Sequence, residues 1–203
     1  MRQEMLERIL KQINDGITEI RLHGRGGQGA VLASKILSKA FYNDGICPQT
    51  FPKYGVERRG APAAAFVRLS ANTSLIQIRC EIYRPHHLIV LDSTLINQIN
   101  IVEGLRESGW IVINSADAPA RFASLGPFRI ATVDATGIAL AHRLGSKTSP
   151  VTNSAILGAF SKVYGSPRLE SLLESIKENV PVKPEENAAA AADSFHQCRT
   201  DSR

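Results

Sequence analysis

A glycine-rich run, His23 to Ala30 (HGRGGQGA), is the segment of this chain best suited to binding a phosphate group. Gly24, Gly26 and Gly29 fit the pattern G-x-G-x-x-G between a strand-like and a helix-like segment. We expect the first glycine to turn the chain with a positive φ, the second to let backbone approach a phosphate, and the third to start the helix close to the sheet. Since a helix N-terminus also favours an anion, the run predicts a phosphate or nucleotide site. The candidate cofactor-binding residues of this loop are Gly24, Arg25, Gly26, Gly27, Gln28 and Gly29.

An ordinary NAD site is disfavoured. The next strand-like segment, Ile46 to Phe51, ends near Gln49 and Thr50, where an NAD site would carry Asp or Glu for the ribose hydroxyls. Asp44 lies at the wrong end of that segment. Glycine-rich turns between strand and helix also occur in α/β proteins that bind nothing there.

A second loop, Pro52 to Pro62, contains two prolines, two glycines and four charged residues, a composition that fits neither helix nor strand. Within it, Glu57, Arg58 and Arg59 place an acid beside two guanidinium groups. Arginine binds carboxylate and phosphate in a bidentate manner, so we include these three residues among the candidate cofactor-binding residues. An interface between subunits or a plain solvated surface are the alternatives for this loop.

Other polar residues have structural interpretations. Asp92 and Asp134 each follow a strand-like segment, where a helix-capping role is expected. His86 and His87 are adjacent at the start of a strand and would point to opposite sides, so we interpret them as structural. His23 precedes the glycine loop, where positioning of the backbone is favoured over a role in proton transfer. No Ser-His-Asp, Cys-His or metal-ligand pattern is found, and we assign no catalytic and no metal-binding residue.

Composition excludes several protein classes. The 203 residues carry a net charge of +5, with basic residues scattered rather than clustered, which gives nucleic-acid binding little support. No stretch approaches the ~18 apolar residues of a membrane span, and no apolar signal region stands at the N-terminus, so a cytoplasmic location is expected. Cys47, Cys80 and Cys198 form no C-x-x-C pair, which argues against a disulfide framework, a zinc site or an iron–sulfur cluster held by this chain alone.

Strand-like and helix-like segments alternate along the chain and must position these loops. The pattern predicts an α/β fold, a three-layer α/β/α sandwich with a mostly parallel, partly mixed, Rossmann-like sheet. Ligands of such sheets bind beyond the carboxyl ends of the strands, so the two loops, Asp92, Asn114 and Asp134 should converge on one crevice. The strands are expected at 17–23, 46–51, 63–70, 74–80 (a hairpin with 63–70), 88–91, 110–113 and 128–133, and helices at 30–41, 95–105, 137–144, 153–164, from 166 and from 184 to 198.

Three segments follow from this pattern. Residues 1–16 form an N-terminal helical extension, residues 17–180 the α/β domain, and residues 181–203 a C-terminal helical tail after a linker bracketed by Pro181 and Pro184. No internal repeat is visible.

Three sequence motifs, in this order along the chain, are similar to those of a known family: HGRGGQGA at the glycine loop, FPKYGVERRGAP followed by AFVRLS, and TNSAILGAF further along. Together they resemble the γ subunit of the 2-oxoacid:ferredoxin (acceptor) oxidoreductases, the family of pyruvate synthase. The resemblance spans about residues 17–190. Two parts of the chain differ from the family's pattern: residues 1–16, which precede the usual start of the family's domain, and the alanine-rich tail.

The resemblance implies a function as one subunit of an enzyme that converts a 2-oxoacid and coenzyme A to acyl-CoA and carbon dioxide. Electrons pass to ferredoxin or another acceptor, while thiamine diphosphate and iron–sulfur clusters lie in partner α, β and δ chains and none is held by this chain alone. It also implies that the loop 54–62 faces the partners and that Thr152 and Asn153, included as candidate cofactor-binding residues, begin a helix nearby. The resemblance identifies neither the particular 2-oxoacid substrate nor the electron acceptor. The alternatives are a stand-alone dinucleotide-binding oxidoreductase and a scaffold subunit that binds no ligand.

Overall fold

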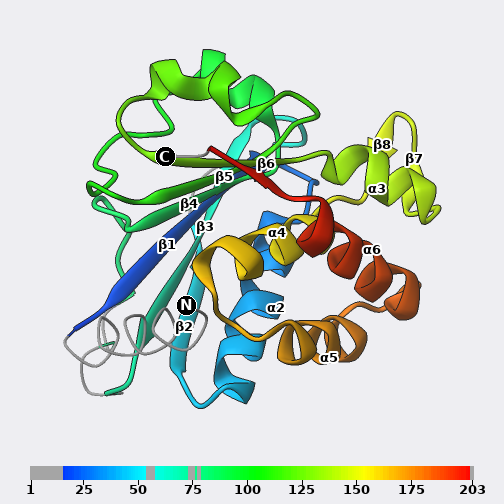
Figure 1. Cartoon of the computed structure of the whole chain (residues 1–203). Coiled ribbons are helices and arrows are strands. Elements are labelled where there is room, and N and C mark those ends of the chain that lie inside the picture. The colour runs from blue at the N-terminus through cyan, green and yellow to red at the C-terminus, as the bar shows by residue number, and fades with distance from the viewer. Residues whose placement is uncertain (1–15, 54–57, 73–75, 77–78, 202–203) are drawn as a thin grey trace.

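The fold is described from a computed structural model, in which residues 16–53, 58–72, 76 and 79–201 are described. Seven strands form one sheet in the order β2-β3-β1-β4-β5-β6-β9 (Figure 1). The members are β1 (Thr18–Arg25), β2 (Cys47–Pro52), β3 (Pro62–Ser70), β4 (His87–Val90), β5 (Trp110–Asn114), β6 (Arg129–Val133) and β9 (Arg199–Thr200). The predicted α/β class and mixed sheet are confirmed.

Parallel and antiparallel pairing divide the sheet. The pairs β1–β4, β4–β5 and β5–β6 are parallel, whereas β1–β3, β2–β3 and β6–β9 are antiparallel. Three of the six strand pairs are therefore antiparallel, which is more than the mostly parallel sheet predicted from the sequence. The chain crosses from β1 to β2 on one side and continues to β4 on the other, so β1 and β4 lie where the winding changes direction. Such a switch point is where open α/β sheets bind ligands.

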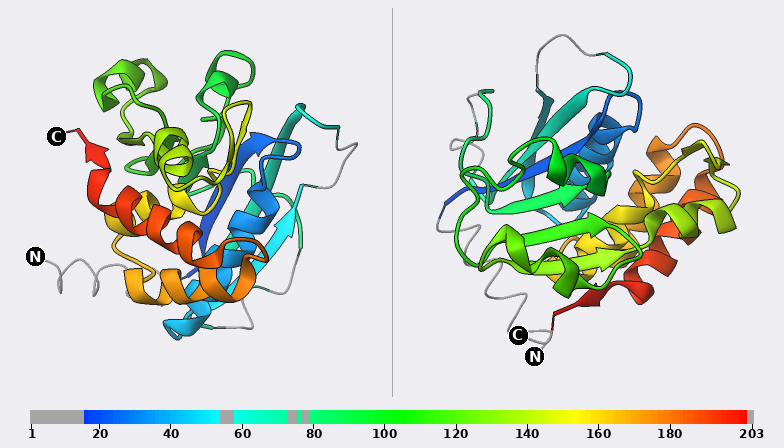
Figure 2. Two further views of the ribbon diagram at one scale, coloured as in Figure 1. Left: turned by 90° about the vertical axis from the view of Figure 1, so that its right-hand side faces the viewer. Right: turned by 90° about the horizontal axis from the view of Figure 1, so that it is seen from above.

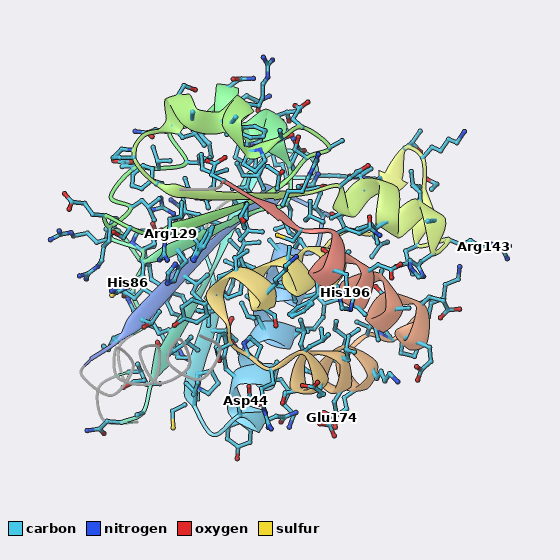
Figure 3. All side chains as sticks on the ribbon, viewed as in Figure 1. Asp44, His86, Arg129, Arg143, Glu174 and His196 are labelled. Atoms are coloured by element: carbon cyan, nitrogen blue, oxygen red, sulfur yellow. The ribbon has the colours of Figure 1, made fainter. Side chains whose placement is uncertain are left out.

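One face of the sheet is covered by α-helices: α2 (Ala30–Asn43), α3 (Ala135–Ala141), α4 (Ala155–Tyr164), α5 (Leu169–Asn179) and α6 (Pro184–Gln197), as Figures 1 and 2 show. Alternation along β1 sends Ile20 and Leu22 into this layer, where both are fully buried. They meet the apolar stripe of α2, including Leu37 and Phe41. At the far end of α2, Asp44 accepts bonds from the backbone N–H (2.6 Å) and the guanidinium Nε (2.9 Å) of Arg168, which joins α2 to the start of α5 (Figure 3).

The opposite face is covered by short 3-10 helices, η2 (Ser93–Asn97) and η3 (Pro119–Leu125), and by the loops around them. Leu88, Val90 and Ile111 point into this smaller core and are fully buried. The predicted α-helix over 95–105 is wrong, because only the 3-10 turn η2 forms and turns follow it. Its apolar residues Leu95, Ile99, Val102 and Leu105 still pack on the sheet, which explains the helix-like spacing without a helix.

The predicted hairpin of 63–70 with 74–80 is not observed. Residues 73–75 and 77–78 lie outside the described residues, and Arg79 and Cys80 are not in a strand. Instead β3 pairs with β1 and β2 on its two sides, so that Phe66 is opposite Arg21 and Phe51. Local spacing alone carries no information on these longer-range partners.

The C-terminal segment is helical, as predicted, and packs on the rest of the molecule. Helix α6 lies against α4 and α5, and its Ala190 and Ala191 are fully buried. Strand β9 then pairs with the edge strand β6. The predicted N-terminal helical extension, residues 1–16, falls almost wholly outside the described residues. In the described part of the chain no helix has the length and apolar character needed to cross a membrane.

Candidate functional site

A cavity of about 400 Å³ opens beyond the carboxyl ends of β1, β4 and β5, and we call it the glycine-loop cavity. The predicted convergence of strand ends is therefore observed, except that Asp134 itself does not line the cavity. Its lining residues are Arg25, Gly26, Gly27, Gln28, Arg59, Gly60, Leu91, Asp92, Ser93, Asn114, Thr136, Thr148, Ser149, Pro150 and Thr152. Most of them are polar or glycine, which suits a charged and hydroxyl-rich ligand.

The two loops singled out from the sequence are joined by backbone hydrogen bonds. Gly26 donates its N–H to the carbonyl of Ala61 (2.9 Å) and accepts from the N–H of Gly60 (3.0 Å), forming a parallel bridge beside Arg59. A Cβ on Gly26 would lie 2.3 Å from the carbonyl oxygen of Arg58, so only glycine fits. The close approach predicted for a phosphate is therefore used by the chain's own second loop.

The other glycines differ from the predicted roles as well. Gly24 is the seventh residue of β1, and the positive φ angles fall at Gly27 (92°) and Gly29 (79°) instead. At Gly29, which begins α2 in a left-handed conformation, a Cβ would lie 2.5 Å from Nδ2 of Asn153. The third glycine thus brings α2 close to the segment before α4, rather than to the sheet.

An ion pair beside the loop fixes its shape. Nε of Arg25 lies 2.8 Å from Oδ2 of Asp92, and the Arg25 guanidinium also donates to the Gly60 carbonyl (3.0 Å) and to Oγ1 of Thr94 (2.7 Å). Gln28 completes the arrangement, since its Oε1 accepts the Arg25 N–H (2.7 Å) and its Nε2 donates to Asp92 (3.0 Å). The side chains of Arg25, Gln28, Asp92 and Thr94 therefore hold the cavity wall in place.

Asp92 is a capping residue, as predicted. Its Oδ1 accepts from the N–H (3.0 Å) and the hydroxyl (2.5 Å) of Thr94 at the start of η2. Burial opposes ionisation of this carboxyl, but the hydrogen bonds from Thr94, Gln28 and Arg25 outweigh it and hold its pKa below the usual value. Asp134 likewise caps α3 by accepting the N–H of Gly137 (2.8 Å). Both carboxylates are therefore engaged in capping hydrogen bonds.

The described residues of the cavity lining carry a net positive charge. Arg25 and Arg59 each contribute +1 and Asp92 contributes −1, which sums to +1. Since Asp92 is neutralised by Arg25, Arg59 supplies the excess, and its side chain has no ion-pair or hydrogen-bond partner among the described residues. Backbone of Gly26 and Gly27 and the hydroxyls of Ser93, Thr136 and Ser149 surround the same space. Such a lining suits a phosphate group.

The structure separates the predicted site residues into two groups. Arg25, Gly26, Gly27, Gln28, Arg59 and Thr152 line the cavity, whereas Gly24, Gly29, Arg58 and Asn153 support it from outside. Glu57 lies outside the described residues. Asn153 is buried and donates to the Gly29 carbonyl at 3.5 Å, while Asn114 binds the Leu91 carbonyl (2.9 Å) and the Thr136 hydroxyl (3.0 Å). Cofactor binding by these residues stays a prediction.

Sequence reasoning missed the far wall of the cavity. Thr148, Ser149 and Pro150 reach it from the short hairpin of β7 (Gly145–Ser146) and β8 (Ser149–Pro150), and Thr136 from the first turn of α3. The position of Thr136, just after a strand end and a capping Asp, was the one available signal. The hairpin carries none, because its place opposite the glycine loop depends on how α3 and α4 pack.

The histidines are structural, in agreement with the sequence. Nε2 of His23 accepts from Nε of Arg21 (3.0 Å), so this nitrogen is unprotonated because the guanidinium can only donate. Burial, with Arg21 and Lys53 nearby, lowers the pKa of His23 to about 3. Nδ1 of His86 and Nδ1 of His87 accept backbone N–H groups of Glu19 and Trp110. Burial lowers the pKa of His87 to about 3 and that of His86 to about 4.

No metal centre is formed by the part of the chain that is described. No group of three or more His, Cys, Asp or Glu side chains there could hold a metal ion. Cys47, Cys80 and Cys198 are free thiols in separate places, and Cys47, interpreted from sequence as a core residue, is only partly buried.

The comparisons with known proteins agree on one family. Residues 19–197 match the family model described as pyruvate ferredoxin/flavodoxin oxidoreductase. The chain is 46% identical over 180 residues to pyruvate synthase subunit PorC of Methanocaldococcus jannaschii, covering 88% of this chain and 96% of that protein. It is 44% identical over 183 residues to the pyruvate/ketoisovalerate oxidoreductases common subunit gamma of Thermococcus kodakarensis, covering 88% and 96%.

Solved structures share the fold. Pyruvate oxidoreductase subunit PORC of Thermotoga maritima is similar with a TM-score of 0.77 and 31% identity, covering 92% of this chain and 99% of that one. The 2-oxoglutarate:ferredoxin oxidoreductase of Magnetococcus marinus gives a TM-score of 0.62 at 18% identity, covering 89% of this chain and 30% of that chain. At that identity the likeness concerns the fold alone, which recurs there within a longer polypeptide.

Proposed function

This chain belongs to the pyruvate ferredoxin/flavodoxin oxidoreductase family and is a gamma subunit of a multi-subunit 2-oxoacid oxidoreductase, and we propose that its glycine-loop cavity binds a phosphate group of coenzyme A. The observation that carries the proposal is the lining of that cavity. Glycine backbone, several hydroxyls and a net charge of +1 meet at the switch point of the sheet. A volume near 400 Å³ accommodates part of coenzyme A, within the ~300–1,000 Å³ typical of ligand pockets.

In the proposed reaction the assembled enzyme converts a 2-oxoacid and coenzyme A to acyl-CoA and carbon dioxide, and two electrons leave to ferredoxin or another acceptor. Relatives named for pyruvate and ketoisovalerate support a 2-oxoacid of similar size as the substrate. Thiamine diphosphate and iron–sulfur clusters are assigned to partner chains of the α, β and δ types, since the described residues offer no metal-ligand group. The enzyme is proposed to act in the cytoplasm.

Within this scheme the chain's own residues bind and orient. Arg59 would attract a phosphate, and Gly27 would let it approach the backbone closely. Arg25 and Gln28 would hold the loop in that shape through Asp92. Among the described lining residues the one carboxylate, that of Asp92, is engaged in four hydrogen bonds and is not free to act as an acid or base.

The proposal is tested with the assembled enzyme and the substitution Arg59→Ala. Loss of one charge-assisted contact, about 1.5–3 kcal/mol, should raise the KM for coenzyme A about tenfold or more without changing the KM for the 2-oxoacid. Lys35→Ala removes the same charge from the exposed side of α2 and should leave both values unchanged. Equal effects of the two substitutions would refute the assignment.

Calorimetric titration of the purified chain separates the alternatives. Coenzyme A and pantetheine serve as probes, since pantetheine lacks the phosphates, and only coenzyme A is expected to release heat. Micromolar binding of NAD(H) or NADP(H) would favour the dinucleotide-binding alternative. If saturating coenzyme A stabilises neither the isolated chain nor the complex against heat, the chain is a scaffold that binds no ligand.

A further inference from the structure

We propose that the face of β2, β3 and β1 opposite the α-helices is the surface on which a neighbouring subunit of the oxidoreductase docks, with an apolar side chain flanked by acidic residues. The inference rests on the chain acting within a multi-subunit enzyme. It concerns a second cavity of about 560 Å³, which we call the sheet-face cavity. Its lining residues are Arg21, His23, Lys53, Pro62, Ala63, Ala64, Phe66, Glu81, Ile82, Tyr83, Ile99, Asn100, Glu103 and Gly104.

The two halves of this sheet face are covered unequally. Over β4, β5 and β6, the helices η2 and η3 bury a continuous apolar core that includes Leu88, Ile111 and Ile130. Over β2, β3 and β1 the buried apolar cluster contains, among the described residues, only Phe51, Ala64, Phe66 and Ile82. Antiparallel sheets often leave one face to water, but such a face is normally polar, whereas this one presents Phe66 and Ala64. The second half therefore offers an apolar surface with a smaller apolar cluster above it.

Apolar residues form the floor of the cavity and an aromatic residue stands at its rim. Phe66 and Ala64 project from β3, and Ile82 closes one side. Tyr83 is 72% exposed, although the residue before it is buried. An exposed tyrosine beside an apolar hollow is typical of protein interfaces, where its ring gains buried area and its hydroxyl finds a partner. The floor thus fits an apolar side chain from another protein.

Charge around the cavity indicates the character of the partner. Lys53 is paired with Glu81 (3.2 Å), and the negative charge of Glu103 lies near enough to favour the charged form of Arg21. Arg79 and Arg84, which flank the wall containing Tyr83, are exposed and have no ion-pair partner among the described residues. The rim therefore has an excess of positive charge, which complements acidic residues on the docking segment.

The cavity wall is preformed. The Arg21 guanidinium donates to the carbonyls of Ile82 (3.4 Å), Ile101 (2.8 Å) and Glu103 (2.8 Å), and so joins both loops of the wall to β1. His23 accepts the remaining Nε–H. A partner would consequently meet a rigid surface, which reduces the conformational entropy lost on binding.

The test compares two exposed tyrosines in the assembled enzyme. Tyr83→Glu removes the rim aromatic and places a negative charge opposite an acidic partner, so the dissociation constant of the chain from the other subunits should rise about 30-fold or more. Tyr42→Glu makes the same change on α2, where Tyr42 is 63% exposed on the helix-covered side, and should have no effect. Both isolated variants should keep the wild-type melting temperature.

The outcomes separate this inference from the proposed function. If the wild-type chain assembles and Tyr83→Glu behaves like Tyr42→Glu, the docking surface lies elsewhere while the proposed function stands. If the wild-type chain fails to assemble with thiamine- and cluster-bearing subunits, the proposed function fails instead. If the isolated chain dimerises and Tyr83→Glu abolishes only that dimer, the surface binds a second copy and the inference is overturned. A weaker salt dependence of assembly after joint Arg79→Ala and Arg84→Ala substitution would support the acidic partner.

Discussion

The two cavities use arginines of the same strand in different ways. In the glycine-loop cavity, Arg25 pairs with a carboxylate and its remaining donors reach exposed groups. In the sheet-face cavity, Arg21 donates to backbone carbonyls of the two loops that form the cavity wall. The first arginine shapes a polar site for a ligand, and the second holds the wall of a surface. Substitution at each should therefore affect different properties.

We expect the greatest loss of stability when the pH is lowered. His23 and His87 have pKa values of about 3 in the folded chain and near 6.5 when unfolded, so the unfolded state binds more protons between these values. Stability is then complete above about pH 6.5 and falls as the pH drops, by about 2.7 kcal/mol per unit for the two groups together, with a further contribution from the less buried His86, whose pKa is about 4. We expect unfolding near pH 4, measured by circular dichroism.

His23→Gln provides the check on this expectation. Glutamine keeps an acceptor for Arg21 but does not titrate, so the slope of stability against pH should fall by about a third to a half. An unchanged slope would show that the sheet-face cavity does not contribute to acid sensitivity.

Replacing Arg21 should lower the stability of the fold more than replacing Arg25. Arg21→Leu leaves the carbonyls of Ile82 and Ile101 without donors and should lower the free energy of unfolding by about 3 kcal/mol. Arg25→Leu should lower it by only about 1.5 kcal/mol, because water can reach the acceptors that it leaves. Urea denaturation measures both. Equal losses in the free energy of unfolding would show that the two arginines do not differ in their contribution to stability.

A third prediction concerns two glycines of one motif. Gly26→Ala would place a Cβ against the Arg58 carbonyl and force the two loops apart, with a loss of about 2 kcal/mol and of the response to coenzyme A. Gly24→Ala meets neighbours only at ordinary distances of 3.4 Å or more and should change stability by no more than about 0.5 kcal/mol. Thermal melts with and without coenzyme A compare the pair. A destabilised Gly24→Ala would contradict the assignment of roles.

The smallest effect is expected at Asp92. Asp92→Asn removes the charge opposite Arg25 and should lower stability by about 1 kcal/mol. The lowered pKa of this carboxyl means that its contribution is present above its unfolded value near 3.9 and is lost only as the pH falls through the folded value. The loss caused by Asp92→Asn should thus be the same at pH 7 and pH 5, unlike that caused by His23→Gln. A difference between the two pH values would indicate that Asp92 titrates in this range.

Local patterns predicted most elements within a few residues. The alternation in 17–23 became β1 with Ile20 and Leu22 buried, and the stripe over 30–41 became α2. The spacing over 95–105 failed, because Leu95 and Ile99 reach the sheet from turns as well as they would from a helix. The partners of β3 also escaped prediction, since strand pairing depends on contacts far apart in the sequence.

Residues close together in the chain were enough to predict the strand-to-helix glycine turn, the capping roles of Asp92 and Asp134 and the family resemblance. The folded structure was needed to see that Arg58 fills the space at Gly26, that Thr148 and Ser149 line the cavity, and that Arg21 and Arg25 have different partners. Hydrogen-bond partners and close approaches between distant segments are fixed by packing of the whole sheet, which no local spacing encodes.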